Sequence, residues 1–149
     1  MARNPLGAVA AAALLTVAAV PAIAKAAETC NGLEATIVGT TGPDDLVGTE
    51  EADVIVGLGG ADTITGLGGD DTICGGTGAD DIDGGHGADT ILGEAGPDTL
   101  LGSFGDDILM GGNGPDSLSG GLGDDLLNGG RHDDSLYGSG GHDTLNGTG

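Results

Sequence analysis

An aspartate recurs at every ninth residue through most of this chain, twelve times without insertion or deletion. These ladder aspartates are Asp44, Asp53, Asp62, Asp71, Asp80, Asp89, Asp98, Asp107, Asp116, Asp125, Asp134 and Asp143. An aliphatic residue follows each of them by two positions, from Leu46 to Leu145, and a glycine precedes each by five, from Gly39 to Gly138. A fixed period in three residue types restricts the chain to a repeat architecture, in which each nonapeptide forms the same structural unit.

Each repeat is numbered from its first glycine, which puts the ladder aspartate at position six and the aliphatic residue at position eight. Glycine at positions one and four suits a turn, because it tolerates positive φ and close backbone approach. Thr, Ile, Val and Leu dominate positions seven to nine and favour strands. The pattern therefore predicts a six-residue turn and a three-residue strand whose position-eight side chain points inward.

Such short strands cannot bury themselves alone, so successive repeats must stack. Two repeats per coil predict two facing parallel sheets, with each ladder aspartate beside the one 18 residues further on. The first edge then carries Asp44, Asp62, Asp80, Asp98, Asp116 and Asp134. The second edge carries Asp53, Asp71, Asp89, Asp107, Asp125 and Asp143.

Stacked strands lie about 4.8 Å apart, and carboxylates at that spacing repel one another. A hard divalent cation between them would relieve the repulsion, because Ca²⁺ accepts six to eight carboxylate and carbonyl oxygens. The formal charge of −21 disfavours nucleic acid and anionic membranes as partners. With 34 Gly and no Trp, the alternative for such an acidic chain is disorder.

Residues 39–146 resemble the G-G-x-G-x-D-x-U-x nonapeptide of the repeats-in-toxin (hemolysin-type) calcium-binding family. The resemblance implies an all-β fold, a right-handed parallel β-roll or β-solenoid of about six 18-residue coils with an N-terminal cap strand. It also implies up to about ten Ca²⁺, each held between two turns of one edge by the ladder aspartates and by backbone carbonyls. The glycines expected to supply carbonyls include Gly57, Gly60, Gly66, Gly69, Gly75, Gly78, Gly84, Gly87, Gly93, Gly96, Gly102, Gly105, Gly111, Gly114, Gly120 and Gly123.

Two repeats depart from the family pattern at position four, where Glu51 and His132 replace glycine. The turns that serve Asp53 and Asp134 are therefore expected to be strained or half-formed. Residues 33–38 read as a degenerate repeat with Ile37 in the apolar register, and they predict a cap strand without a metal ligand. Residues 147–149 begin a further repeat, and we expect this uncapped end to allow self-association.

The first residues have the character of a secretory leader, with Arg3, an Ala-rich apolar stretch, Pro21 and small-residue steps near Ala24 and Ala26. We expect a signal peptide over residues 1–24, cleaved after residue 24 or 26, then a cap segment over 25–38. A retained membrane helix is the alternative. Removing Arg3 and Lys25 takes the formal charge to −23, which ten Ca²⁺ would nearly cancel.

Export to an oxidising compartment favours a disulfide between Cys30 and Cys74. Cys30 precedes the repeats whereas Cys74 ends the fourth, so the bond requires the entry segment to fold back along the stack. Two unpaired thiols are the alternative.

The sequence contains neither H-E-x-x-H nor G-x-S-x-G, so we expect no enzyme activity. His86, His132 and His142 occupy unrelated turn positions and are interpreted as surface residues rather than transition-metal ligands. Thr at position seven is too often interrupted to favour ice binding. The leading hypothesis is a secreted, extracellular calcium-binding protein that folds on binding Ca²⁺. The alternatives are a calcium-dependent adhesion or self-assembly module, and a fragment of a toxin, lipase or protease.

Overall fold

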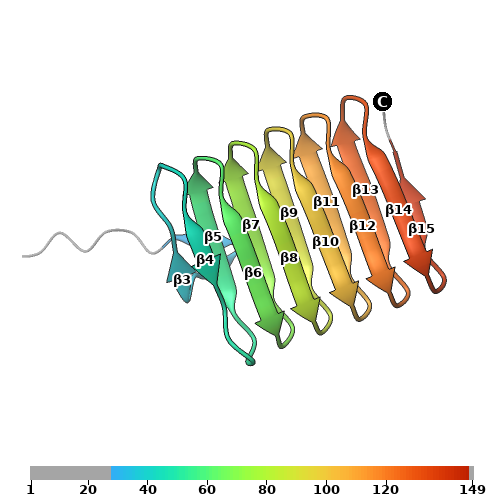
Figure 1. Ribbon diagram of the computed structural model, residues 1–149, viewed down its shortest axis with the longest axis horizontal. Helices are drawn as coiled ribbons and strands as arrows, with labels where there is room; N and C mark the ends of the chain where they lie inside the picture. Colours follow the sequence, from blue (N-terminus) through green and yellow to red (C-terminus); the bar gives the residue numbers. More distant parts are fainter. Residues whose placement is uncertain (1–27, 148–149) are drawn as a thin grey trace, which may run out of the picture.

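The computed structural model describes residues 28–147, in which a short entry segment leads into a flattened coil of parallel strands (Figure 1). The predicted leader over residues 1–24 lies outside these described residues. No helix occurs in residues 28–147. The described part of the chain accordingly offers no apolar helix of membrane-spanning length.

Two sheets face each other along the coil (Figure 1). The six-stranded sheet consists of β4 (Asp45–Val47), β6 (Thr63–Gly68), β8 (Asp81–His86), β10 (Thr99–Phe104), β12 (Ser117–Leu122) and β14 (Ser135–Gly140). The seven-stranded sheet consists of β3 (Ile37–Val38), β5 (Val54–Gly59), β7 (Thr72–Thr77), β9 (Thr90–Ala95), β11 (Ile108–Asn113), β13 (Leu126–Arg131) and β15 (Thr144–Asn146). Strands alternate between the sheets along the chain.

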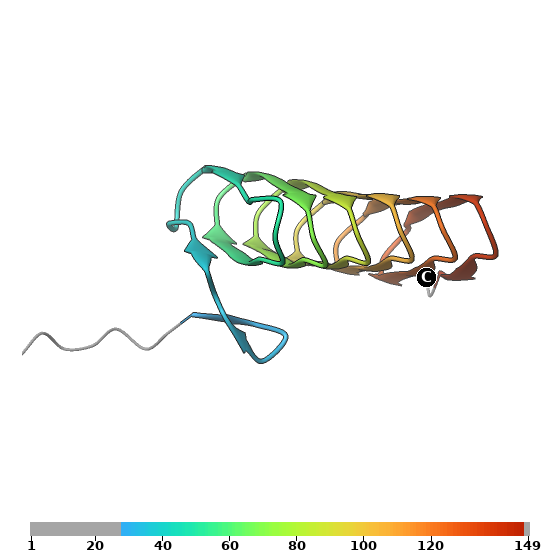
Figure 2. The same ribbon diagram turned by 90° about the horizontal axis from the view of Figure 1, so that it is seen from below.

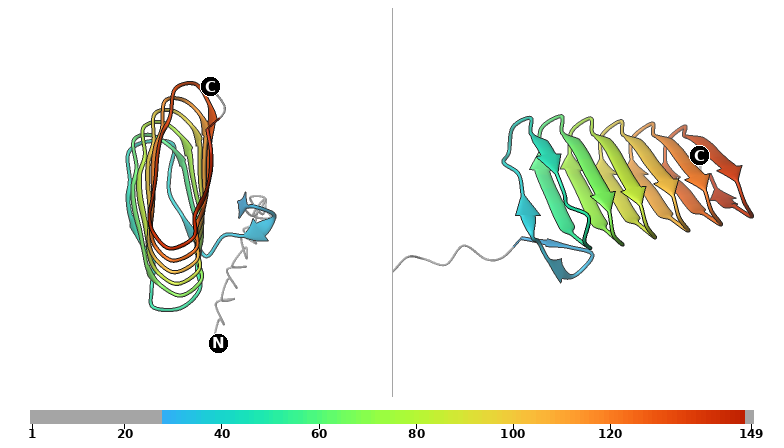
Figure 3. Two further views of the ribbon diagram at one scale, coloured as in Figure 1. Left: turned by 90° about the vertical axis from the view of Figure 1, so that its right-hand side faces the viewer. Right: turned by 60° about the horizontal axis from the view of Figure 1, so that its bottom comes forward.

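The register between neighbouring strands advances by 18 residues. In the six-stranded sheet, Leu100 pairs with Ile82 on one side and with Leu118 on the other. Equivalent positions of successive coils therefore lie side by side, and the end-on view shows the coils superimposed as flattened rings (Figure 3). The predicted parallel β-solenoid of about six coils is confirmed.

The strands are longer than the sequence predicted. From β5 to β14 each has six residues, covering positions seven to nine of one repeat and one to three of the next. Pairing continues through the glycine-rich part, where Ser103 pairs with Gly121 and Phe104 with Leu122. In the first two repeats no strand covers positions one to six, as predicted. From the third repeat onwards the prediction of a six-residue turn was wrong, because stacking imposes pairing on residues with little strand propensity. Only positions four to six form the turn.

A single column of position-eight side chains forms the core. Its nine central members are at most 1% exposed: Ile55, Ile64, Ile73, Ile82, Ile91, Leu100, Leu109, Leu118 and Leu127. Ile37, Leu46 and Leu136 are partly buried against the column. One apolar residue per repeat is thus enough to line the narrow space between the sheets, and the carboxylates lie at the two edges of that space.

The entry segment forms a hairpin outside the roll (Figure 2). Strands β1 (Thr29–Cys30) and β2 (Leu33–Glu34) pair antiparallel, and β3 then joins the stack with Ile37 beside Ile55. Ile37 is therefore in the predicted apolar register. Leu33 and Glu34 belong to the hairpin and not to a degenerate repeat, which corrects that part of the prediction.

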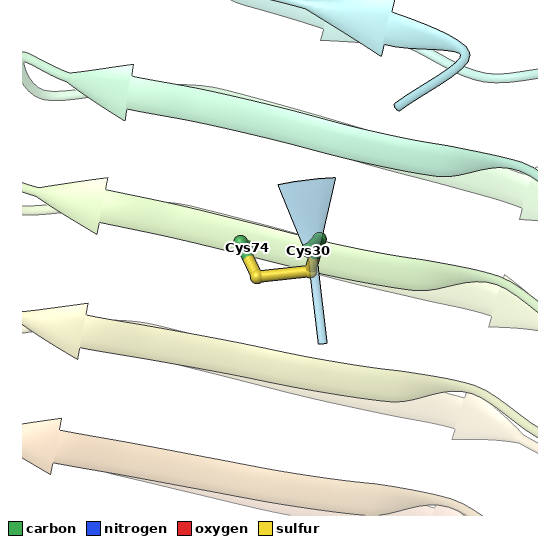
Figure 4. Close-up of a disulfide and its surroundings, with 2 residues drawn as sticks. All are labelled: Cys30 and Cys74. Atoms are coloured by element: carbon green, nitrogen blue, oxygen red, sulfur yellow. A yellow bond between two sulfur atoms is a disulfide. The ribbon is translucent and has the colours of Figure 1, made fainter. Parts of the chain in front are cut away.

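A disulfide ties this hairpin to the outer face of the seven-stranded sheet (Figure 4). Cys30 bonds to Cys74 of β7, and the two residues are 44 positions apart. Both side chains are buried with Val56 in a second apolar cluster. A loop of this length loses about 4 kcal/mol of unfolded-state entropy on closure in the chain-entropy description. The hairpin and the first four repeats are thereby closed into one loop.

Candidate metal centre

The ladder aspartates are the last residues of the turns, and the alternation of the sheets separates them into two edges. Asp62 lies between β5 and β6, where the chain leaves the seven-stranded sheet, and Asp71 lies between β6 and β7, where it returns. The 18-residue register repeats these two positions in every coil. The structure thus places the first-edge and second-edge aspartates in two separate columns.

The carboxylates in these columns are buried. Eight ladder aspartates are no more than 3% exposed: Asp62, Asp71, Asp80, Asp89, Asp98, Asp107, Asp116 and Asp125. Asp53 is 8% exposed. Burial of an ionised carboxylate is unfavourable unless both oxygens have partners or the group is neutralised.

One oxygen of each inner carboxylate has a partner in the preceding coil. Asp80 N–H, for example, donates to Asp98 Oδ1 at 2.9 Å, and Asp98 N–H donates to Asp116 Oδ1 at 2.9 Å. Ten such bonds, of 2.8 to 3.1 Å, join every ladder aspartate to the next one on its edge. They fix the orientation of the carboxylates along each column.

The second oxygen is buried without a hydrogen-bond partner in most of the ladder. This holds for Oδ2 of Asp62, Asp71, Asp80, Asp89, Asp98, Asp107, Asp116, Asp125 and Asp134. A buried polar atom left unsatisfied costs about 1–3 kcal/mol, and more when it is charged. Nine repetitions of one unsatisfied atom indicate a site for a ligand and not an isolated packing defect.

Glycine at position one keeps a space beside these oxygens. A β-carbon on Gly93 would lie 2.5 Å from Asp98 Oδ2 and 2.8 Å from the carbonyl oxygen of Gly111 in the next coil. Carboxylate and carbonyl oxygens of adjacent coils therefore border the same small volume, which any side chain would fill. Carboxylate and carbonyl oxygens are ligands of the kind that Ca²⁺ prefers.

Glycine at position four has a different role. Gly96 has φ of +136°, and a β-carbon there would collide with the carbonyl oxygen of Gly78. The turns of successive coils consequently approach through bare backbone. Glycine permits this approach because it has no β-carbon.

Among residues 28–147, no three His, Cys, Asp or Glu side chains converge as a metal site. A cation beside Asp98 Oδ2 would have the Gly111 carbonyl oxygen as a neighbour as well as the carboxylate. The histidines do not contribute a cluster: His86 stacks on Phe104 with ring centroids 4.5 Å apart, and His142 N–H donates to Asp124 Oδ1. The donor set fits a hard cation and not a transition metal.

Burial raises the pKa of most inner ladder carboxyls. For Asp98 the pKa rises to about 7, first through burial and then through repulsion from Asp80 and Asp116, against the lowering effect of the Asp80 N–H. Burial similarly raises the pKa of Asp107 to about 7 and that of Asp71 to about 6. The pKa values of Asp80, Asp89, Asp116 and Asp125 are also raised, with burial as the largest cause.

These raised pKa values predict that acid stabilises the calcium-free roll. A carboxyl whose folded pKa exceeds its ordinary value of 3.8 stabilises the fold while protonated, and this contribution is lost as pH rises towards about 7. Far-UV circular dichroism of calcium-stripped protein should show more β structure at pH 5 than at pH 8. A calcium-free fold that becomes more stable between pH 5 and pH 8 would contradict this prediction.

Asp53 differs from the inner ladder. Burial raises its pKa, but hydrogen bonds from Thr49 and Thr36 outweigh burial, and the net pKa is lowered. Thr36 Oγ1 donates to Asp53 Oδ1 at 2.9 Å, and Thr49 contacts Oδ2 through both its N–H and its hydroxyl at 2.8 Å. Neither threonine was predicted to contact a ladder aspartate.

Glu51 and His132, which replace glycine at position four, differ in backbone conformation. The turn at Asp53 was expected to be strained or half-formed; the strain is absent, because Glu51 is not among the residues with positive φ. His132 does adopt a positive φ, of 85°, which is unfavourable for a residue with a β-carbon. The predicted strain at the turn of Asp134 is therefore present.

Comparison with known protein families matches the RTX calcium-binding nonapeptide repeat to six overlapping segments of this chain. The segments are 38–73, 47–82, 65–100, 83–118, 101–131 and 119–149. Together they cover residues 38 to 149, which include every ladder aspartate. No curated protein matches the chain.

Proposed function

We propose that this chain, which belongs to the RTX calcium-binding nonapeptide repeat family, is a secreted, non-enzymatic protein whose β-roll folds on binding Ca²⁺. The ladder aspartates are the side-chain ligands, and the glycine-rich turns supply carbonyl oxygens. Each cation lies between two stacked turns of one edge. Bound there, it supplies positive charge between oxygens that otherwise repel.

The single observation that carries this proposal is the row of nine buried Oδ2 oxygens without partners. Each belongs to a carboxylate whose other oxygen is already fixed by the preceding coil. The open atom and its orientation are thus specified by the fold, while the partner has to come from outside the chain. Calcium suits this arrangement better than magnesium, which requires near-ideal octahedral geometry and dehydrates reluctantly.

Export is supported by the leader-like composition of residues 1–24 and by the disulfide between Cys30 and Cys74. Extracellular calcium is abundant, so sites with dissociation constants of about 10⁻⁴ to 10⁻³ M would be filled there. Folding would then be delayed until the chain has left the calcium-poor interior of the cell. The protein would be inert before export and a rigid rod afterwards.

Equilibrium dialysis of the purified protein against calcium tests the binding directly. We expect several ions to bind per chain, because each edge has several equivalent gaps between neighbouring ladder aspartates. Magnesium in large excess should displace few of them. Saturation below one calcium ion per chain would overturn the proposed function.

Self-assembly is a second candidate, and one observation favours it. Strands β14 and β15 are outer strands of their sheets, and Leu145, which pairs with Leu127 across β13 and β15, is 45% exposed. Exposed strand edges and apolar residues at the end of a sheet can pair with another chain. Light scattering that increases with calcium and with protein concentration would support this role, whereas a monomer at all concentrations would exclude it.

A further inference from the structure

The first turn on each edge differs from all the later ones, at Asp44 and at Asp53. Thr40 N–H donates to Asp44 Oδ2 at 2.6 Å, and the Thr40 hydroxyl lies 3.0 Å from the same oxygen. Thr49 makes the equivalent two contacts with Asp53 Oδ2, both at 2.8 Å. Oδ2 of Asp44 and of Asp53 therefore has hydrogen-bond partners within the chain, whereas Oδ2 of the inner ladder aspartates has none.

The backbone of the two turns differs in the same way. From the third repeat onwards, every residue at position two has positive φ, including Leu58, Leu67 and Glu94. Thr40 and Thr49, at position two of the first and second repeats, do not. A β-branched residue strongly disfavours positive φ, and the alternative conformation turns its N–H towards its own ladder carboxylate.

Position four follows the same division. Gly60 and its equivalents have positive φ in every later repeat, whereas Gly42 and Glu51 do not. Gly42 N–H and Glu51 N–H each donate to the hydroxyl of the threonine two residues earlier, at 3.2 Å. Each threonine hydroxyl thus accepts from position four and can donate to the carboxylate, which gives the whole turn a closed set of hydrogen bonds.

We infer that Thr40 and Thr49 take the place of a cation in the first turn of each edge, so that these two turns close without calcium and the ladder of metal ligands begins at Asp62 and Asp71. This inference rests on the proposed function for the later turns. Twelve ladder aspartates leave ten gaps between neighbours of one edge, and two of these gaps involve Asp44 or Asp53. At most eight pairs of neighbouring ladder aspartates then have, on both residues, an Oδ2 without a hydrogen bond from threonine.

The two closed turns lie within the segment joined by the disulfide from Cys30 to Cys74. The roll consequently begins with a part whose turns and cross-link need no metal. Strands β8 and β9 can add to this part as soon as calcium fills the next gaps, between Asp62 and Asp80 and between Asp71 and Asp89. Calcium-dependent folding would thus proceed from the N-terminal end of the roll.

Introducing glycine at position two in place of threonine tests the inference, because it should create an additional calcium site. Equilibrium dialysis should give at most eight calcium ions for the wild-type protein. The T40G variant and the T49G/E51G variant should each bind one more. T41G, which replaces the neighbouring exposed threonine that has no bond to the carboxylate, should leave the number unchanged. Ten ions in the wild type, or no gain in T40G and T49G/E51G, would overturn the inference.

Hydrogen exchange in calcium-free protein provides a test that does not depend on calcium binding. The amides of Thr40 and Thr49 should be protected, and T40V and T49V, which keep the β-branch but lose the hydroxyl, should exchange at least about tenfold faster at these amides. Exchange at the unfolded rate in the wild type would overturn the inference. If dialysis found no calcium at all, the proposed function would fail, while protected amides would still support the role of the threonines.

Discussion

Replacing Asp98 by Asn should change the stability of the roll in opposite directions with and without calcium. In the calcium-free protein, the change removes a buried charge, since the pKa of Asp98 is raised to about 7 by burial and by its ladder neighbours. The asparagine oxygen can still accept the Asp80 N–H. Its amide group can donate towards the Gly111 carbonyl, which borders the same space. Calcium-free D98N should therefore be more stable than the wild type at pH 8.

With calcium present, the same substitution should be destabilising. Asp98 borders two gaps, one towards Asp80 and one towards Asp116, so D98N removes an anionic ligand from both. We expect the calcium concentration at the folding midpoint to rise by roughly tenfold or more, which corresponds to about 1.4 kcal/mol per factor of ten. Chemical denaturation at saturating calcium measures the destabilisation, and the β content of D98N and of the wild type in chelator at pH 8, by far-UV circular dichroism, measures the stabilisation.

Two variants serve as matched controls. D81N removes the same charge from the exposed outer face of β8 and should change neither condition by more than about 0.5 kcal/mol. D143N changes the last ladder aspartate, which borders a single gap, and its effect on the calcium midpoint should be smaller than that of D98N. A D98N effect of equal sign in both conditions, or equal effects of D98N and D81N, would show that the ladder carboxylates do not bind the cation.

Removal of calcium from the wild-type protein should have the largest effect of all. Two unit charges about 4.8 Å apart repel by roughly 3 to 4 kcal/mol at the effective dielectric constant of a protein, and each edge stacks several such pairs. Domains of this size are stable by only about 5–15 kcal/mol. The ionised ladder cannot persist without a counter-charge, so the later coils should unfold at neutral pH when calcium is chelated.

The architecture of the coil was predictable because its determinants are local and repeated. One aliphatic residue per repeat, at a position that points inward, defines the core column from Ile55 to Leu127. Two nonapeptides form one coil of 18 residues, and this sets the pairing of Leu100 with Ile82 and Leu118. The strand length could not be read in the same way, since residues such as Gly121 pair only because a neighbouring coil is already present.

The hairpin and the threonine turns were not predicted from the sequence, although each has a recognisable sequence feature. Asn31 and Gly32 have φ of 50° and 82°, and an Asn-Gly pair between two short extended segments is a strong indicator of a tight hairpin. Thr40 and Thr49 are the only β-branched residues at position two of any repeat. That contrast becomes informative once the structure shows positive φ at this position in every later repeat.

The most direct test of calcium-coupled folding is far-UV circular dichroism of the purified protein at pH 7.5, recorded in calcium, then in excess chelator, then after calcium is restored. We predict a strong β signal that is largely lost on chelation and returns with calcium, while equimolar magnesium fails to restore it. Residual signal in chelator should come from the disulfide-linked N-terminal part. A β signal that is unchanged by chelation would contradict the account.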